Sequence, residues 1–203
     1  MSEESLSVSG SALILVVCTA NLCRSPVAEH LVRARVAQLG LTAAVQVSSA
    51  GVAARPGTEM DPAAARELRV RGLDPADFRT RVLTAEHVRS AQLVLVASRR
   101  HRIAVAELDA TAVRRTFTLR EMGRIAAALA AESQLRLGSR LGLLELVDHV
   151  RHARASYPPA RPGEDDLADP FRRGPKAMTD CADLVVAACE PWLALLAGRT
   201  GPP

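Results

Sequence analysis

The sequence predicts an α/β fold, a three-layer doubly wound sandwich built around a central, four-stranded parallel sheet. Continuous apolar runs rich in β-branched residues, such as ALILVV at 12–17, are typical of strands that helices cover on both faces. Amphipathic helical patterns alternate with these runs, and a strand–helix–strand order requires crossovers that leave the strands parallel. A chain of 203 residues can bury one sizeable core and is short for two.

Each expected strand is followed by a helical segment. The strands are expected at 12–17, 44–51, 91–98 and 112–119. The helices are expected at 25–40, 61–72, 99–108, 119–132, 141–155 and 175–198. In the first helix, Pro26 suits the first turn and Gly40 ends the apolar stripe. This order places the loop after the first strand beyond a carboxyl end of the sheet, where such folds bind ligands.

Composition indicates a single folded domain over 12–198. Apolar residues make up 48% of the chain, which excludes disorder of the whole. We expect the polar, acidic residues 1–11 to form a disordered leader rather than a signal peptide, and 199–203 to form a tail. The longest apolar runs fall far short of the roughly 20 residues that cross a bilayer, so no membrane insertion is expected. A cytoplasmic location with reduced cysteines is the resulting expectation.

The basic charge of the chain does not predict nucleic-acid binding. The net charge is +4, but the basic residues are scattered along the sequence. Aromatic residues, at 2%, do not interleave with the arginines as base-stacking surfaces require. We therefore expect an ordinary solvated surface and no nucleic acid as partner.

The loop CTANLCRS, at 18–25, follows the first strand and leads into the first helix. Backbone N–H groups of such a loop converge on one point, and the helix amino end adds a positive partial charge, so the loop forms an anion site. Cys18 would face this site as a stabilised thiolate. Arg24 offers a planar, bidentate fork to a phosphate. The combination favours phosphoryl transfer through a phosphocysteine intermediate.

Other interpretations of the two cysteines in this loop fit less well. Cys18 and Cys23 lack C-x-x-C spacing, and no second pair of cysteines or histidines follows at a suitable distance, so no metal is expected. The glycine-rich ATP-binding pattern G-x-x-x-x-G-K-[ST] does not occur. Two buried cysteines without a chemical role remain the plain alternative.

The stretch VCTANLCRSPVAEHL, at 17–31, is similar to the signature C-x-x-N-x-C-R-S-P of the low-molecular-weight protein tyrosine phosphatases. The resemblance extends to SSAG at 48–51, to Asp61-Pro62 and to FTLREM at 117–122, and so covers most of 12–197. It implies a flavodoxin-like, phosphotyrosine phosphatase I-like fold. It also implies a cofactor-free phosphatase that hydrolyses phosphotyrosine in proteins or peptides, and aryl phosphates, and releases inorganic phosphate.

The resemblance also implies a role for each residue of the loop. Cys18 would be the nucleophile, and Arg24 would bind the phosphate and stabilise the transition state. Ser25 would donate a hydrogen bond to the Cys18 thiolate as it leaves. Cys23 would form a reversible disulfide with Cys18 under oxidants. The other expected members of the phosphate-binding loop and its support are Thr19, Ala20, Asn21, Leu22 and Ser49, with Asn21 bonded to Ser49.

A general acid for the leaving group is expected on a loop before the last helix. LADPFRRG contains Asp169-Pro170-Phe171, similar to the family's D-P-Y/F element, so Asp169 would act first as acid and then as base. An ordinary Asp-Pro turn is the alternative. Asp165 and Asp166 are fallback candidates, expected as solvated loop charges.

Three departures from the family pattern concern the surroundings of the loop. Phe78 stands where a histidine often supports Asn21. Phe171 is followed by Arg172 rather than by a second aromatic residue, which weakens stacking on phosphotyrosine and could favour acidic peptides. Arg55, after the second strand, borders the active site in the family and could tune substrate choice.

The segment 124–165 is longer than a minimal family member needs. It contains the expected amphipathic helix at 141–155, which would pack on the sheet's edge or bind a partner, with His149 and His152 as surface residues. Cys181 and Cys189 lie on the apolar stripe of the last helix and are expected to be packing residues.

Two further functions stay open at this point. A thiol-dependent arsenate reductase of the same fold would need a relay of cysteines on a flexible loop. A non-catalytic phosphopeptide-binding module would be expected to lack Cys18 or the acid, and both are present.

Overall fold

A computed structural model of the protein describes residues 11–132 and 140–198. The expected leader, apart from residue 11, and the expected tail at 199–203 lie outside the described residues. The same holds for 133–139 within the long segment 124–165.

Four strands form one parallel sheet in the order β2-β1-β3-β4. They are β1 (Ala12–Cys18), β2 (Val45–Gly51), β3 (Leu93–Val96) and β4 (Thr116–Thr118). This topology confirms the predicted α/β fold. The fourth strand is shorter than predicted, because residues 110–115 form the 3-10 helix η1 (Ala110–Arg115) instead. The Asp109 carboxylate accepts from the Thr111 N–H and pairs with Arg115, which closes the turn.

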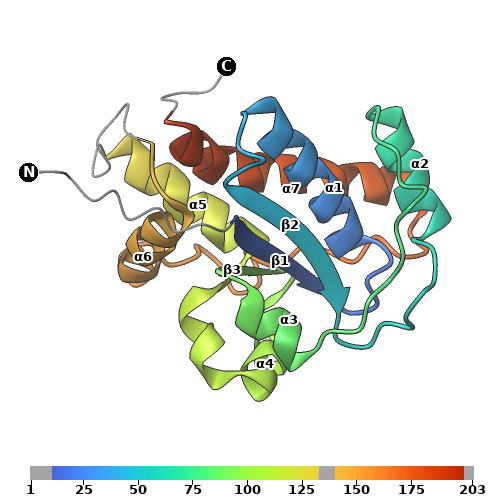
Figure 1. Ribbon diagram of the computed structural model, residues 1–203, viewed down its shortest axis with the longest axis horizontal. Helices are drawn as coiled ribbons and strands as arrows, with labels where there is room; N and C mark the ends of the chain where they lie inside the picture. Colours follow the sequence, from blue (N-terminus) through green and yellow to red (C-terminus); the bar gives the residue numbers. More distant parts are fainter. Residues whose placement is uncertain (1–10, 133–139, 199–203) are drawn as a thin grey trace, which may run out of the picture.

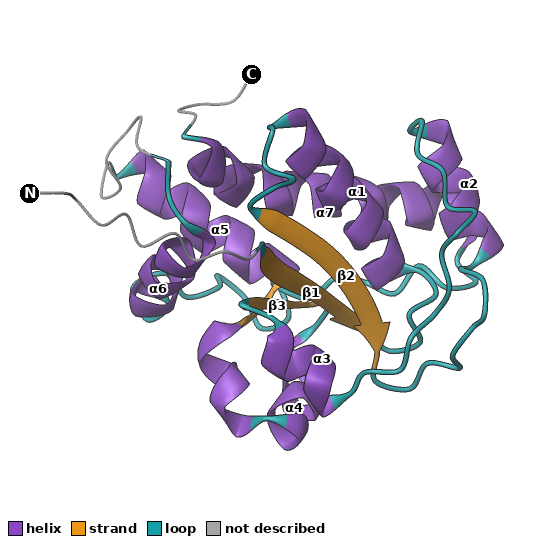
Figure 2. Cartoon of the chain, viewed as in Figure 1, coloured by secondary structure: helices purple, strands orange, loops and turns teal. Residues whose placement is uncertain are grey.

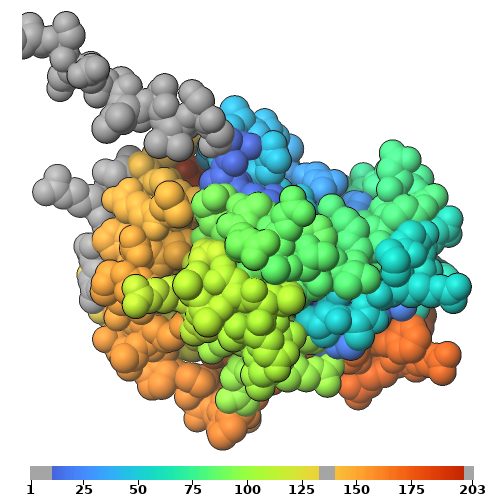
Figure 3. Space-filling view, turned by 60° about the horizontal axis from the view of Figure 1, so that its bottom comes forward, coloured from blue at the N-terminus to red at the C-terminus, as the bar shows by residue number. Residues whose placement is uncertain are grey.

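Helices cover both faces of the sheet (Figures 1 and 2). They are α1 (Arg24–Gln38), α2 (Pro62–Val70), α3 (Ala85–Ser90), α4 (Arg99–Leu108), α5 (Leu119–Ala131), α6 (Leu143–Ala153) and α7 (Gly174–Ala197). The six-residue α3 was not predicted; Thr84 precedes it as the N-cap residue, and the Thr84 side chain accepts from the His87 N–H. In Figure 3, α3 and α4 cover one face in green and yellow-green, beside the orange segment that includes α6.

Alternation along β1 divides the core into two layers. Ile14 and Val16 belong to the apolar cluster shared with α1, α5, α6 and α7. Leu15 and Val17 point the other way, into the cluster that contains Val88 of α3 and Val105 of α4. All four β1 side chains are at most 1% exposed, as expected for a central strand buried on both faces.

The helix predicted at 141–155 is α6, and it covers the edge of the sheet beside β4. Its buried face contributes Leu146 and Val150 to the larger core cluster. Just beyond its end, the Arg154 guanidinium lies 4.2 Å from the centre of the Phe117 ring and donates to the Thr116 carbonyl oxygen at 2.6 Å. His149 and His152 are exposed on its outer side, as predicted. Within the described ranges, no helix is both long and apolar enough to span a membrane.

Replacing Gly123 of α5 with alanine should destabilise the protein. A Cβ at this position would lie 2.8 Å from the backbone of Ala188 in α7, where neither helix has a flexible atom to move. Overpacking of this kind costs about 1–3 kcal/mol, more than the helix propensity that alanine gains. Urea unfolding of Gly123→Ala is the measurement. The control is Gly142→Ala, since a Cβ there has no neighbour within 4 Å. Equal midpoints for the two variants would contradict the expectation.

Candidate active site

The loop that connects β1 to α1 is folded over a glycine of the neighbouring strand. Gly51 ends β2 opposite Cys18, and a Cβ on it would lie 2.7 Å from both the Asn21 nitrogen and the Thr19 oxygen. The chain after Gly51 also holds the loop, because Val52 N donates to the Cys18 oxygen at 3.0 Å and Ala53 N to the Thr19 oxygen at 2.8 Å. The small residues at the end of β2 therefore let the loop approach the sheet.

Asn21 holds the turn of the loop in a left-handed backbone conformation, with φ at 55°. Its side chain is fully buried. The amide Nδ2 donates to Ser25 Oγ and Ser49 Oγ, both at 2.8 Å, and Oδ1 accepts from the Arg81 N–H at 2.8 Å. The contact with Ser49 is the one expected. The Arg81 backbone thus supports the Asn21 side chain, while Phe78 packs in an apolar cluster with its ring near His30.

Cys18 lies at the base of the loop with its sulfur 3.0 Å from Ser25 Oγ. The thiol is buried, with 2% of the residue exposed. Ser25 Oγ already accepts a hydrogen bond from Asn21, so its own hydrogen is available to the sulfur. A hydroxyl in this position can stabilise a thiolate by a hydrogen bond.

Arg24 and Asp169 meet at the same place from opposite ends of the chain. Arg24 Nη2 lies 2.7 Å from Asp169 Oδ2, although the arginine side chain is 4% exposed and the aspartate side chain 47%. Arg24 Nη1 also donates to the Leu167 carbonyl oxygen at 3.4 Å. A pocket of about 180 Å³ lies between them, lined by Cys18, Thr19, Ala20, Leu22, Cys23, Arg24, Asp169 and Phe171. The structure thus brings the expected nucleophile, phosphate ligand and acid together.

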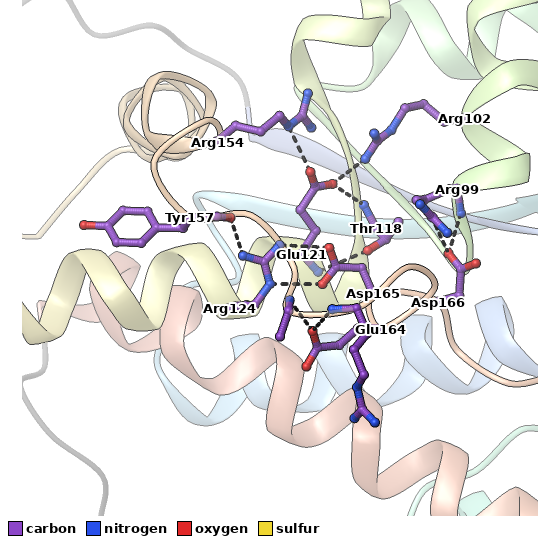
Figure 4. Close-up of polar contacts among 12 residues, drawn as sticks. Arg99, Arg102, Thr118, Glu121, Arg124, Arg154, Tyr157, Glu164, Asp165 and Asp166 are labelled. Carbon is purple, nitrogen blue, oxygen red and sulfur yellow. Dashed lines mark hydrogen bonds and ion pairs between the residues drawn. The ribbon is translucent and has the colours of Figure 1, made fainter.

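Asp165, expected as a solvated loop charge, is instead buried, and for it the prediction was wrong; the Asp166 side chain is partly exposed and is hydrogen-bonded (Figure 4). Asp165 is 5% exposed and forms a two-point ion pair with Arg124 of α5, at 3.1 and 2.8 Å. Asp166 accepts from the Arg99 N–H at 2.7 Å, which satisfies a free donor at the start of α4. Neither carboxylate lines the pocket.

Glu29 is a supporting residue whose role the sequence did not reveal. Its carboxylate is buried on α1 and accepts from Ser49 Oγ at 2.6 Å. Arg33 and Arg81 neutralise it, with Arg81 Nη2 at 3.3 Å. The signal available in the sequence was its position four residues after Ser25, on the same helical face.

His101 is a second residue that sequence reasoning missed. It is 2% exposed, with Nδ1 at 2.9 Å from Ser98 Oγ and Nε2 at 3.0 Å from Thr19 Oγ1. Burial, together with the nearby Arg24 and Arg100 charges, lowers the pKa of His101 to about 4. A neutral imidazole therefore holds the second residue of the loop.

The remaining cysteines are buried thiols. Burial, with the Asp61 and Asp169 charges, raises the pKa of Cys23 far above its usual range. Burial raises the pKa of Cys181 to about 11 and that of Cys189 to about 12, and both lie on the packed face of α7 as expected. In the part of the chain that the structure describes, no cluster of histidine, cysteine or acidic residues could hold a metal ion.

The expected substrate rim is only partly assembled around the pocket. Phe171 lines it and is 42% exposed, and the Arg172 guanidinium lies 5.1 Å from the centre of the Phe171 ring. Arg55 is exposed and does not line the pocket, and its carbonyl oxygen accepts from Thr58 and Thr80.

Comparison with known proteins gives relatives that are named as tyrosine or arginine phosphatases. A probable low molecular weight protein-tyrosine-phosphatase, EpsP, from Ralstonia solanacearum is 40% identical over 83 residues, which are 41% of this chain and 53% of the relative. The chain thus spans about half the length of that relative. A protein-arginine-phosphatase from Geobacillus stearothermophilus is 34% identical over 142 residues, 68% of this chain and 92% of the relative. The structure of the YwlE arginine phosphatase from the same organism superposes with a TM-score of 0.65 and 25% identity, over 91% of this chain and 92% of that chain.

The family model described as low molecular weight phosphotyrosine protein phosphatase matches residues 13–128, more than half of the sequence. The matched region contains the loop, Ser49, Gly51 and His101. The chain therefore belongs to the low molecular weight phosphotyrosine protein phosphatase family.

Proposed function

We propose that the protein hydrolyses phosphotyrosine in proteins or peptides, and small aryl phosphates, through a phosphocysteine intermediate and without a metal. The observation that carries the proposal is the meeting of Cys18, Arg24 and Asp169 in one pocket. Family membership and the relatives named as tyrosine phosphatases support it.

In the first step, the Cys18 thiolate attacks phosphorus and the bond from phosphorus to the phenolic oxygen breaks. Asp169, as the carboxylic acid, protonates the leaving oxygen, while Arg24 binds the phosphoryl oxygens. The arriving phosphate dianion replaces Asp169 as the partner of Arg24. Asp169 can change partners because its side chain is half-exposed on the loop, whereas Arg24 is fixed and buried.

In the second step, Asp169 as carboxylate takes a proton from a water molecule, whose oxygen attacks phosphorus. The sulfur–phosphorus bond breaks, inorganic phosphate forms, and the Cys18 thiolate receives the Ser25 hydrogen bond. The nucleophile requires a reduced thiol. A reducing compartment such as the cytoplasm, which we propose for the protein, keeps thiols in this form.

The pocket favours a narrow, flat leaving group, since Leu22 and Phe171 offer apolar surface on the way to Cys18. Phosphoarginine is the second candidate substrate, because a relative covered over 92% of its length is named protein-arginine-phosphatase. Peptides of one sequence carrying either phosphotyrosine or phosphoarginine, compared by kcat/KM, decide between them.

Removing the nucleophile or the acid should have different kinetic signatures. Cys18→Ser should lower kcat on an aryl phosphate at least about a thousandfold, because a serine hydroxyl is a far weaker nucleophile than a thiolate and a poorer leaving group from phosphorus. Asp169→Asn should lower kcat by about 10²–10⁴-fold for a poor leaving group and much less for p-nitrophenol, which departs unprotonated. The measurement is the initial rate of hydrolysis of two aryl phosphates, one with a poor leaving group and p-nitrophenyl phosphate, each with and without EDTA.

The matched control for these variants is Cys189→Ala, whose buried thiol lies on α7 outside the pocket and should leave both rates unchanged. Activity that survives in Cys18→Ser, or that EDTA abolishes in the wild type, would refute the mechanism.

Cys23 should make oxidative inactivation reversible. Peroxide converts the Cys18 thiolate to a sulfenic acid; the Cys23 sulfur then attacks this sulfur, and water leaves as the disulfide forms. A dithiol should restore most of the activity of the wild type and of Cys181→Ala, but little in Cys23→Ala. Recovery of Cys23→Ala to the wild-type level would show that Cys23 offers no protection.

His101 should make the free energy of unfolding depend on pH. Its pKa is about 4 in the folded protein against 6.5 as the ordinary value, so the unfolded chain binds more protons between these limits. The contribution of neutral His101 to the free energy of unfolding is complete above pH 6.5. It is lost as the pH falls toward 4, and the loss is about 3 kcal/mol at most. Urea unfolding at pH 7 and pH 4.5 should show a smaller acid-induced loss for His101→Gln than for wild type or for His149→Gln, in which the replaced histidine is exposed. The same loss in all three proteins would contradict the expectation.

A further inference from the structure

Two arginines at the mouth of the pocket have no carboxylate partner. Arg100 lies in the first turn of α4, and Arg172 lies on the loop 167–173 that carries Asp169, here called the acid loop. Both side chains are exposed, and among the described residues neither guanidinium is paired with an acidic group. Their neighbours differ in this respect. Arg24 is paired with Asp169, and Arg99 lies 3.8 Å from Asp166. Both positive charges therefore lie next to residues that line the pocket, Thr19 and Phe171.

Arg100 is close to the position that the phosphate would take. Its Nη2 donates to Thr19 Oγ1 at 3.2 Å, and Arg24 Nη2 lies 3.4 Å from the same oxygen. Like charges this close repel each other, so the mouth of the pocket attracts anions. A phosphate dianion would pair with the buried Arg24, whereas the exposed Arg100 would stay available to another anionic group on the same substrate.

Arg172 follows the pocket residue Phe171 and has a backbone conformation that side chains disfavour. Its φ is 59°, and within 11–132 and 140–198 the other residue besides glycine with a positive φ is Asn21. Arg172 packs its guanidinium against the ring of Phe171, which lines the pocket. The acid loop therefore presents a positive group beside the apolar surface that a substrate ring would contact.

We propose that Arg100 and Arg172 recognise acidic residues that flank the phosphorylated residue, so that the preferred substrates are acidic phosphopeptides. This inference rests on the proposed phosphatase function and specifies its substrate class. Flanking carboxylates would pair with the two arginines while the phosphate occupies the loop between them. The pairs are exposed, so each contributes modestly and is screened by salt.

Two phosphotyrosine peptides that differ only in glutamate or glutamine on either side of the phosphorylated residue test the proposal. Wild type should prefer the glutamate peptide about tenfold in kcat/KM at low salt, and less at 0.5 M NaCl. Arg100→Gln and Arg172→Asn should each reduce this ratio about threefold, and the double variant should abolish it. Asparagine is chosen because it tolerates the left-handed conformation. Arg100→Glu should reverse the preference.

The ratio of kcat/KM for the glutamate peptide to that for the glutamine peptide reports recognition of charge alone. A substitution that disturbs the catalytic groups changes both values equally, because both peptides react at the same groups. The control is Arg114→Gln in η1, an exposed arginine before the amino end of β4, which should keep the wild-type ratio. A ratio near one in wild type, or an unchanged ratio in the double variant, would overturn the proposal.

Hydrolysis of a small aryl phosphate reports the proposed function separately. If it fails, the phosphatase assignment fails, and the affinity of the Cys18→Ser variant for the two peptides, by fluorescence anisotropy, still decides the recognition. Tighter binding of the glutamate peptide, lost with Arg100→Gln and Arg172→Asn, supports it; equal binding overturns it.

Discussion

A buried asparagine in a left-handed conformation is stable only if its polar atoms are hydrogen-bonded, and Asn21 meets this condition through three different segments. Ser25 belongs to α1, Ser49 to β2, and the Arg81 N–H to the chain before α3. The loop thus keeps its shape only when the first crossover and the segment after α2 are both in place. The geometry of the nucleophile depends in this way on contacts across 60 residues of sequence.

The direction of these hydrogen bonds determines what each hydroxyl can do. Asn21 Nδ2 can only donate, so Ser25 and Ser49 must accept from it and turn their own hydrogens elsewhere. Ser49 donates to the buried carboxylate of Glu29, and Ser25 faces the Cys18 sulfur. One side-chain amide therefore orients the hydroxyl that stabilises the thiolate. The burial of Glu29 is tolerated because Arg33 and Arg81 neutralise it.

Local patterns were enough to predict β1, the loop and α1, because apolar alternation and the C-x-x-N-x-C-R-S-P spacing lie within one stretch of chain. The shortening of β4 was not predictable, since it follows from one Asp109 side chain that closes a 3-10 turn. His101 and Glu29 were missed for a different reason: each acts on a residue far away in sequence, Thr19 and Ser49. Nothing in the pattern around His101 marks it as buried, and the position of Glu29 four residues after Ser25 does not by itself reveal its contact with Ser49.

The acid loop is held by contacts at its beginning, around Asp165 and Leu167, and is less restrained at Asp169. The segment around α6 contributes to the contacts that hold its beginning. Arg124 joins Asp165 to α5 and also donates to the Tyr157 carbonyl oxygen, while Arg154 and Arg102 both pair with Glu121 (Figure 4). The last anchor is the Leu167 N–H, which donates to the Ala97 oxygen at 2.8 Å.

Only Ala168 separates this anchor from Asp169, so in the proposed mechanism the carboxylate would exchange Arg24 for a leaving group mainly by rotating its own side chain. A general acid must lie within hydrogen-bond distance of the leaving oxygen when the bond to phosphorus breaks. A short unrestrained stretch next to a fixed one limits the number of positions that the carboxylate can take. The segment before the last helix, through Tyr157 and Asp165, therefore supports the loop that carries Asp169, the proposed acid.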